Sequence, residues 1–246
     1  MRAFLLALQL LTVVTVRSDI RGEPAELAAS RGFYGLVGAL LGAVLALWAW
    51  GLWAWLPPLV AAGLLLATWE GLTRFLHADG LADSADALVY FSDRQQTLAI
   101  MKDTRLGSFG VAAMITVYLV KFAALACLPW PALAGALVAA PALGRAAAAM
   151  LSVLLPAARV DQGLGAAVAQ ATSPWPGIAA AACAIAAAGL AAGVPGLWSV
   201  LAVVALVTGL GAWFRRRLGG VTGDTLGATI ELSETVVLVV MAALVC

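Results

Sequence analysis

The sequence has few charged residues and few of the side chains that soluble enzymes use for catalysis. Lys, Arg, Asp and Glu make up 11% of its 246 residues, with a single histidine, whereas about 25% of a typical soluble domain is charged. Hydrophobic residues make up 63%, in several runs close to the roughly 18 to 20 residues that cross a bilayer. The composition excludes a soluble domain and predicts an all-α, polytopic integral membrane helix bundle.

Cysteine, positive charge and nucleotide-binding motifs are also scarce. Cys127, Cys183 and Cys246 stand apart in apolar runs without the spacing of a metal or redox motif, so we expect small core residues. The net charge of +1 gives no information about nucleic acid, and no basic patch with interleaved aromatic residues supports such a partner. No Walker A lysine motif is present, so ATP-driven transport is not supported.

We expect one integral membrane domain over residues 1–246, with about seven transmembrane helices. The first sixteen residues contain a mostly apolar stretch about fourteen residues long, which is too short to span and predicts an N-terminal interfacial or re-entrant helix. The predicted spans cover about 33–55, 58–76, 108–128, 132–155, 177–193, 197–214 and 229–246.

Charge is distributed very unequally between the predicted loops. The turns 56–58, 129–131 and 194–196 contain no charged residue, whereas the alternate loops contain most of the charge, including Arg215, Arg216 and Arg217. Because positive charge favours the cytoplasmic side, we expect the N-terminus inside and the C-terminus outside. The acidic residues fall on the same inner side, so the chemistry is predicted there.

The stretch 70–110 holds about half of the acidic residues. Asp79, Asp83 and Asp86 are spaced i, i+4 and i+7, which places three carboxylates on one face of a helix. Such a group favours Mg²⁺ or Mn²⁺ over zinc. The alternative interpretation is a solvated acidic helix face.

A second acidic group stands at the far end of the chain. Asp224, Glu231 and Glu234 lie at the start of the last apolar run, where carboxylates are costly and usually functional; the alternative is that they complement the helix dipole. We expect Glu70, paired at i+4 with Arg74, and Glu234 to extend the metal site if the second and last spans are neighbours.

Basic residues are predicted to bind an anion beside these acids. Lys102 and Arg105 precede Gly107 and Gly110 at the start of a span, where free backbone N–H groups would favour phosphate. Arg159 and Asp161, before Gly163 and Gly165, open onto the same face. Arg145 and Lys121 lie deeper, where each could pair with a buried acid or reach a phosphate. Acids, metal and cations together indicate phosphoryl transfer from a diphosphate.

Two motifs resemble those of the adenosylcobinamide-GDP ribazoletransferase (cobalamin synthase) family. They are HADGLADSAD at residues 77–86 and IMKDTRLGSFG at residues 100–110. Further similar segments extend over most of the chain and include RGFYG at 31–35, AR at 158–159 before GLG at 163–165, and TGD at 222–224.

The resemblance implies Mg²⁺-dependent transfer of adenosylcobinamide phosphate from adenosylcobinamide-GDP to α-ribazole or its 5′-phosphate, releasing GMP. It implies these small-molecule substrates, a surrounding lipid bilayer, a possible homo-oligomer, and a bacterial inner membrane with the active site facing the cytoplasm. As catalytic residues we expect Asp79, Asp83, Asp86, Lys102 and Arg105, with metal held by Glu70, Asp79, Asp83, Asp86 and Glu234. The expected substrate-binding residues are His77, Gly107, Gly110, Arg145, Arg159, Asp224 and Glu231.

Two alternatives remain at this point. CDP-alcohol phosphotransferases also use an aspartate cluster led by Asp-Gly, but their signature has Ala-Arg where this chain has Asp83 and Ser84. A cation-coupled transporter would place its acids near mid-depth rather than at one face.

Overall fold

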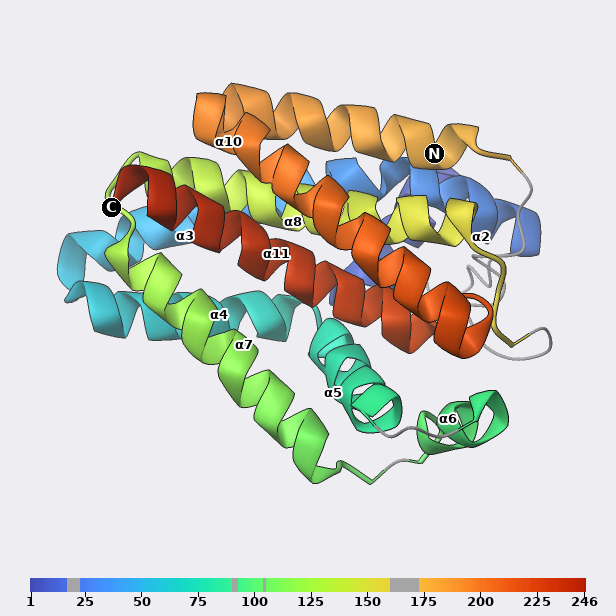
Figure 1. Ribbon diagram of the computed structural model, residues 1–246. Helices are drawn as coiled ribbons and strands as arrows, with labels where there is room; N and C mark the ends of the chain where they lie inside the picture. The colour runs from blue at the N-terminus through green and yellow to red at the C-terminus, as the bar shows by residue number, and fades with distance from the viewer. Residues whose placement is uncertain (17–22, 90–92, 104, 160–172) are drawn as a thin grey trace.

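The structure is a computed structural model that describes residues 1–16, 23–89, 93–103, 105–159 and 173–246. All regular secondary structure in these ranges is helical, as the sequence predicted, apart from one isolated bridge between Ala157 and Val221. The helices are α1 (Arg2–Leu11), α2 (Pro24–Ser30), the 3₁₀ helix η1 (Arg31–Phe33), α3 (Tyr34–Trp55), α4 (Pro58–Leu72), α5 (Leu76–Val89), α6 (Arg94–Ile100), α7 (Ser108–Cys127), α8 (Ala132–Leu154), α10 (Trp175–Leu218) and α11 (Gly223–Val245) (Figure 1).

Five of these described helices are long and apolar enough to cross a membrane, or six if the bent pair α4–α5 counts as one span. The sequence predicted about seven. The difference arises because the predicted spans 177–193 and 197–214 form one element, α10, whose two arms meet at Gly193 in a non-helical conformation (φ 59°). Figure 1 shows the arms folding back toward each other. Each predicted apolar segment therefore folds as a helix.

The central helix is α8, which packs against α3, α10 and α11 (Figure 1). It meets α3 at Gly38 and Gly42, where an added Cβ would collide with the backbone at Pro141 and Leu137. Small residues permit such close packing in lipid, where helices gain little from the hydrophobic effect. Large side chains such as Leu190 instead lie on the outside, 90% exposed, and form the lipid-facing surface.

The chain bends by 88° between α4 and α5. Arg74 and Phe75 lie in the bend with positive φ. The predicted i, i+4 pair of Glu70 with Arg74 is therefore wrong: α4 ends at Leu72, and the Arg74 guanidinium donates to the carbonyl groups of Gln9 and Thr12. After the bend, the inner connection between the second and third predicted spans contains α5, the helix predicted from the aspartate spacing, and the short helix α6.

Two features concern the ends of the chain. The ten-residue apolar helix α1 is too short to span, in agreement with an interfacial or re-entrant segment. Cys127 and Cys246, expected in the core, are exposed, and Cys183 is partly exposed. The expectation of core cysteines is wrong because all three lie on or beside lipid-facing helices whose apolar sequence resembles that of a core.

Candidate active site

The three aspartates of α5 lie on one helix, as their spacing predicts, and a fourth joins them from α11. Helices α5 and α11 cross at Gly80 and Gly227, where a Cβ added at Gly80 would lie 2.7 Å from the Asp224 carbonyl oxygen. This close approach sets Asp224, on the first turn of α11, beside the α5 carboxylates. We call Asp79, Asp83, Asp86 and Asp224 the aspartate group.

Asp83 shows how strongly these charges interact. Partial burial first, and then the negative charges of Asp79, Asp224 and Asp86, raise the pKa of Asp83 to about 6. The positive charge of Arg159 acts in the opposite direction. Carboxylates that repel one another in this way, with Asp79 exposed at the edge, are groups that a hard divalent cation would draw together. Among the described residues, however, only Glu70, Glu231 and Glu234 already have carboxylate oxygens within 4.8 Å of one another.

Asp86 differs from the other aspartates because backbone N–H groups of another helix bind its carboxylate. Its two carboxylate oxygens accept hydrogen bonds from the backbone N–H groups of Gly107 and Gly110, at 2.8 and 2.9 Å. A Cβ on either glycine would collide with this carboxylate. The expectation that these N–H groups are free to bind phosphate is therefore wrong. Asp86 itself is the anion at the start of α7 and fixes α7 to α5.

Of the predicted basic residues, Arg159 lies near enough to the aspartate group to influence Asp83 and Asp224. The Arg159 guanidinium donates to the Leu98 carbonyl oxygen and leaves its Nε buried without a hydrogen-bond partner in the described structure. Lys102 and Arg105 are both exposed, and Arg105 is paired with Asp103 at 2.6 Å. A bound diphosphate would compete with Asp103 for the planar guanidinium fork.

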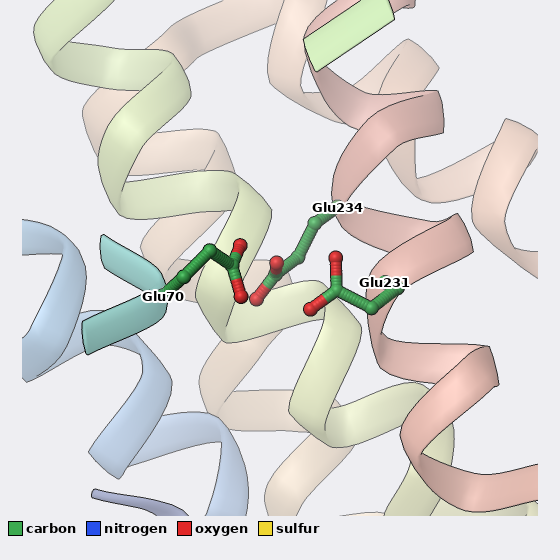
Figure 2. A group of neighbouring side chains, drawn as sticks. All are labelled: Glu70, Glu231 and Glu234. Carbon is green, nitrogen blue, oxygen red and sulfur yellow. The ribbon is translucent and has the colours of Figure 1, made fainter. Parts of the chain in front are cut away.

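The deeper acids form a separate network in the bundle core. Glu70 from α4 and Glu231 and Glu234 from α11 have carboxylate oxygens within 4.8 Å of one another, and Figure 2 shows the three side chains pointing toward one another. The Lys121 ammonium from α7 donates to all three, with distances of 2.8 Å to Glu234 and 3.4 Å to Glu70.

Arg145 from α8 completes this network. It donates to the second oxygen of Glu234 at 2.8 Å, while its Nε and Nη2 atoms are buried without a hydrogen-bond partner in the described structure. Lys121 and Arg145 are both 0% exposed. We call Glu70, Glu231, Glu234, Lys121 and Arg145 the glutamate network.

This arrangement revises the predicted roles of the deeper residues. Of the options left open for Arg145 and Lys121, the structure shows pairing with a buried acid for both residues. The glutamates meet, but with Lys121 among them rather than as an edge of the aspartate group, because Glu231 lies seven residues, about 10 Å, further along α11 than Asp224. A metal ion at the three glutamates would have to displace Lys121.

His77 lies on α5, 3% exposed, with its Nε2 atom unpartnered in the described structure. Burial first, and then the charges of Arg145 and Lys121, lower the pKa of His77 well below its usual value, so the ring is neutral. The predicted site residues at Gly163, Gly165 and Asp161 lie outside the described residues.

The contacts of two basic residues, Lys121 and Arg94, were not predicted from the sequence. Lys121 was given little weight because a lone lysine in an apolar run has no local partner, yet three acids from two other helices meet it. Arg94 was assigned no role, although its guanidinium donates to the carbonyl groups of Leu218 and Ala158 at 2.6 and 2.9 Å and so joins α6 to the inner end of α10. No sequence spacing marks either contact.

Comparison with known proteins gives a consistent family assignment. The sequence model of the cobalamin-5-phosphate synthase family matches residues 3–242. Relatives named adenosylcobinamide-GDP ribazoletransferase include one from Pseudomonas fluorescens, 44% identical over 246 residues, covering 98% of this chain and 99% of the relative. A relative of the same name from Pseudomonas entomophila is 43% identical over 250 residues, with both chains covered completely.

A third relative of that name, from Pseudomonas aeruginosa, is 42% identical over 243 residues and covers 98% of each chain. No solved structure matches the chain. The match runs through both motif regions and through the helices that carry the aspartate group and the glutamate network. This chain belongs to the cobalamin-5-phosphate synthase family.

Proposed function

We propose that this protein is an adenosylcobinamide-GDP ribazoletransferase of cobalamin biosynthesis. The observation that carries the proposal is the aspartate group, assembled from α5 and α11 within a chain that matches the family from end to end. It transfers the adenosylcobinamide-phosphate group from adenosylcobinamide-GDP to α-ribazole or its 5′-phosphate.

The proposed reaction is a displacement at phosphorus. A ribazole hydroxyl oxygen attacks the phosphorus on the cobinamide side of the diphosphate, the anhydride bond breaks, and GMP leaves with the bridging oxygen. The hydroxyl proton passes to a carboxylate of the aspartate group. In this proposal Lys102, Arg105 and Arg159 stabilise the negative charge that develops on the diphosphate.

Mg²⁺ is the metal that this donor set suits. Asp79, Asp83 and Asp224 would hold it, because both oxygens of Asp86 already accept backbone N–H groups and the three glutamates already bind Lys121. When bound, the ion would neutralise the diphosphate and polarise its P–O bonds. Among the protein's residues, Asp86 orients the start of α7, and Arg105 can exchange Asp103 for phosphate.

We place the protein in the bacterial inner membrane with the aspartate group facing the cytoplasm. Arg215, Arg216 and Arg217 end α10, just before the start of α11 with Asp224. The turns at the opposite ends of the helices contain no charged residue. This asymmetry follows the positive-inside rule and puts the site on the side where nucleotide substrates are made.

The test is a reaction with purified protein in detergent. Adenosylcobinamide-GDP is supplied with or without α-ribazole and with or without Mg²⁺, and both GMP and the joined cobalamin product are quantified by chromatography. We expect equal amounts of GMP and product only when α-ribazole and Mg²⁺ are both present.

Asp83→Asn is the matched control, because it keeps the size of the side chain and removes its charge. It should unfold at a temperature no lower than the wild-type protein does and lose activity by about 100-fold or more, on the order of 3 kcal/mol in the barrier. GMP release without product would indicate a hydrolase, and no reaction with any α-ribazole substrate would contradict the proposal.

A further inference from the structure

Two cysteines meet at the end of the bundle opposite the aspartate group. Cys127 is the last residue of α7, and Cys246 directly follows α11. Their Sγ atoms are 2.8 Å apart, and the Cys246 Sγ lies 3.2 Å from the Cys127 carbonyl oxygen. Both side chains are exposed, so a thiol reagent or an oxidising partner can reach them.

This separation is close to that of a covalent bond. A disulfide joins sulfur atoms about 2.05 Å apart, so the pair needs to close by less than about 1 Å. The two residues are 119 positions apart in the chain, and the packing of α7 against α11 holds them together. Cys183 lies in the first arm of α10 and is a natural internal control.

The side of the membrane on which the two cysteines are expected favours oxidation of their thiols. Cys127 adjoins the charge-free turn 129–131, and the orientation given under the proposed function places this end outside the cytoplasm. Disulfides form and persist in such oxidising compartments and are rare in the cytosol. The inference rests on that orientation but not on the transferase chemistry.

We propose that Cys127 and Cys246 form an intramolecular disulfide on the outer face of the membrane. One thiolate attacks a sulfur of an external disulfide oxidant and expels its first thiolate, which leaves a mixed disulfide. The second cysteine thiolate then attacks the protein sulfur of that mixed disulfide and expels the second thiolate of the oxidant. The protein gains one S–S bond and loses two hydrogen atoms, and the oxidant is reduced to two thiols.

The bond fastens the outer ends of two helices that carry members of the glutamate network and the aspartate group. α7 bears Lys121 and is anchored by Asp86, while α11 bears Asp224 and the glutamates that bind Lys121. A covalent link at the far end resists separation of α7 from α11 without touching the reacting groups.

The experiment counts free thiols in protein taken directly from cells. Cells are quenched in acid, the protein is denatured, and free thiols are labelled with a maleimide that shifts the gel band, with or without prior reduction. Without reductant we expect one labelled thiol in the wild-type protein, two in Cys127→Ser and in Cys246→Ser, and none in Cys183→Ser. With reductant the wild type should show three.

Three labelled thiols in unreduced wild type would overturn the proposal, as would a reducible band of twice the mass. Diamide oxidation of the purified, reduced protein then identifies the cause. If diamide closes the bond and removes two hydrogen atoms by mass, the membrane orientation is at fault; if it does not, the sulfur geometry is at fault. Transferase activity is measured separately in both cases, so failure here is distinguishable from failure of the proposed function.

Discussion

The ammonium of Lys121 lies 2.8 Å from one carboxylate oxygen of Glu234, both side chains being almost completely removed from solvent. Arg145 binds the other oxygen of the same carboxylate at 2.8 Å. Glu234 on α11 is thus held by α7 and α8 together, and through Lys121 it is linked to Glu70 at the end of α4. The glutamate network therefore joins four helices, two of which also carry or anchor the aspartate group.

Replacing Lys121 by Met should destabilise the protein strongly. The change leaves three buried carboxylates around an apolar side chain, and removing one partner of a buried ion pair costs about 3 to 5 kcal/mol. We expect a lower thermal transition in detergent and partial recovery in Lys121→Met/Glu231→Gln. The matched control is Lys102→Met, because Lys102 is the only other lysine and is exposed. Equal transitions for the two single variants would refute the role of the network.

Gly110→Ala should disturb the contact between α5 and α7. The new Cβ would lie 2.5 Å from an Asp86 carboxylate oxygen and 2.9 Å from the Ala82 carbonyl oxygen, and such overpacking typically costs about 1 to 3 kcal/mol. Gly209→Ala in α10 meets nothing within 4 Å and should be neutral or stabilising by up to about 1 kcal/mol. Thermal unfolding of both variants checks the prediction, which fails if Gly110→Ala is as stable as Gly209→Ala.

Asp86→Asn should reduce stability and activity while leaving metal affinity unchanged. An amide has one acceptor oxygen where the carboxylate has two, so one of the N–H groups of Gly107 and Gly110 loses its partner, at a cost of about 1 to 3 kcal/mol. Activity measured against Mg²⁺ concentration should show a lower plateau at the same midpoint. A midpoint raised severalfold, with full activity recovered at high Mg²⁺, would make Asp86 a metal ligand instead.

The raised pKa of Asp83 predicts how pH affects the metal-free protein. Because the folded state raises this pKa from 3.8 to about 6, the folded protein binds more protons than the unfolded chain between these values. The contribution of Asp83 to stability is therefore lost as pH rises from about 4 to 6. Mg²⁺ should raise the thermal transition at pH 7.5 and much less at pH 5, where the proton competes with it.

Asp83→Asn should flatten this pH dependence and abolish the Mg²⁺ effect on the thermal transition. A wild-type Mg²⁺ effect that is equally large at pH 5 and pH 7.5 would show that Asp83 does not titrate in this range. A transition scanned at both pH values, with and without the metal, distinguishes these results.

The features of this site that depend on local sequence spacing were predicted, whereas several that depend on the backbone conformation or on long-range contacts were not. The i, i+4, i+7 pattern placed Asp79, Asp83 and Asp86 on one helix, and apolar run lengths located each membrane helix. The bend after Leu72 was not predicted, because residues 58–76 read as one continuous apolar segment and the positive φ values of Arg74 and Phe75 have no sequence signature such as glycine.

Which groups each acidic residue contacts also depended on the tertiary structure. Asp86 belongs to the same i, i+4, i+7 pattern as Asp79 and Asp83. It caps a helix only because the start of α7 packs against it and donates two backbone N–H groups to its carboxylate. Similarly, Glu70 and Glu234 read as candidate metal ligands until Lys121 is found among them. The charge pattern thus identified candidate residues, and helix packing determined which side chains each of them contacts.

The central claim is that the aspartate group holds the divalent ion and the glutamate network does not. Direct titration of purified protein with Mn²⁺, followed by electron paramagnetic resonance, tests it without reference to catalysis. We predict that Asp79→Asn weakens Mn²⁺ binding by about 10- to 100-fold, whereas Glu70→Gln binds Mn²⁺ like the wild type. Loss of Mn²⁺ binding in Glu70→Gln with unchanged binding in Asp79→Asn would contradict the account.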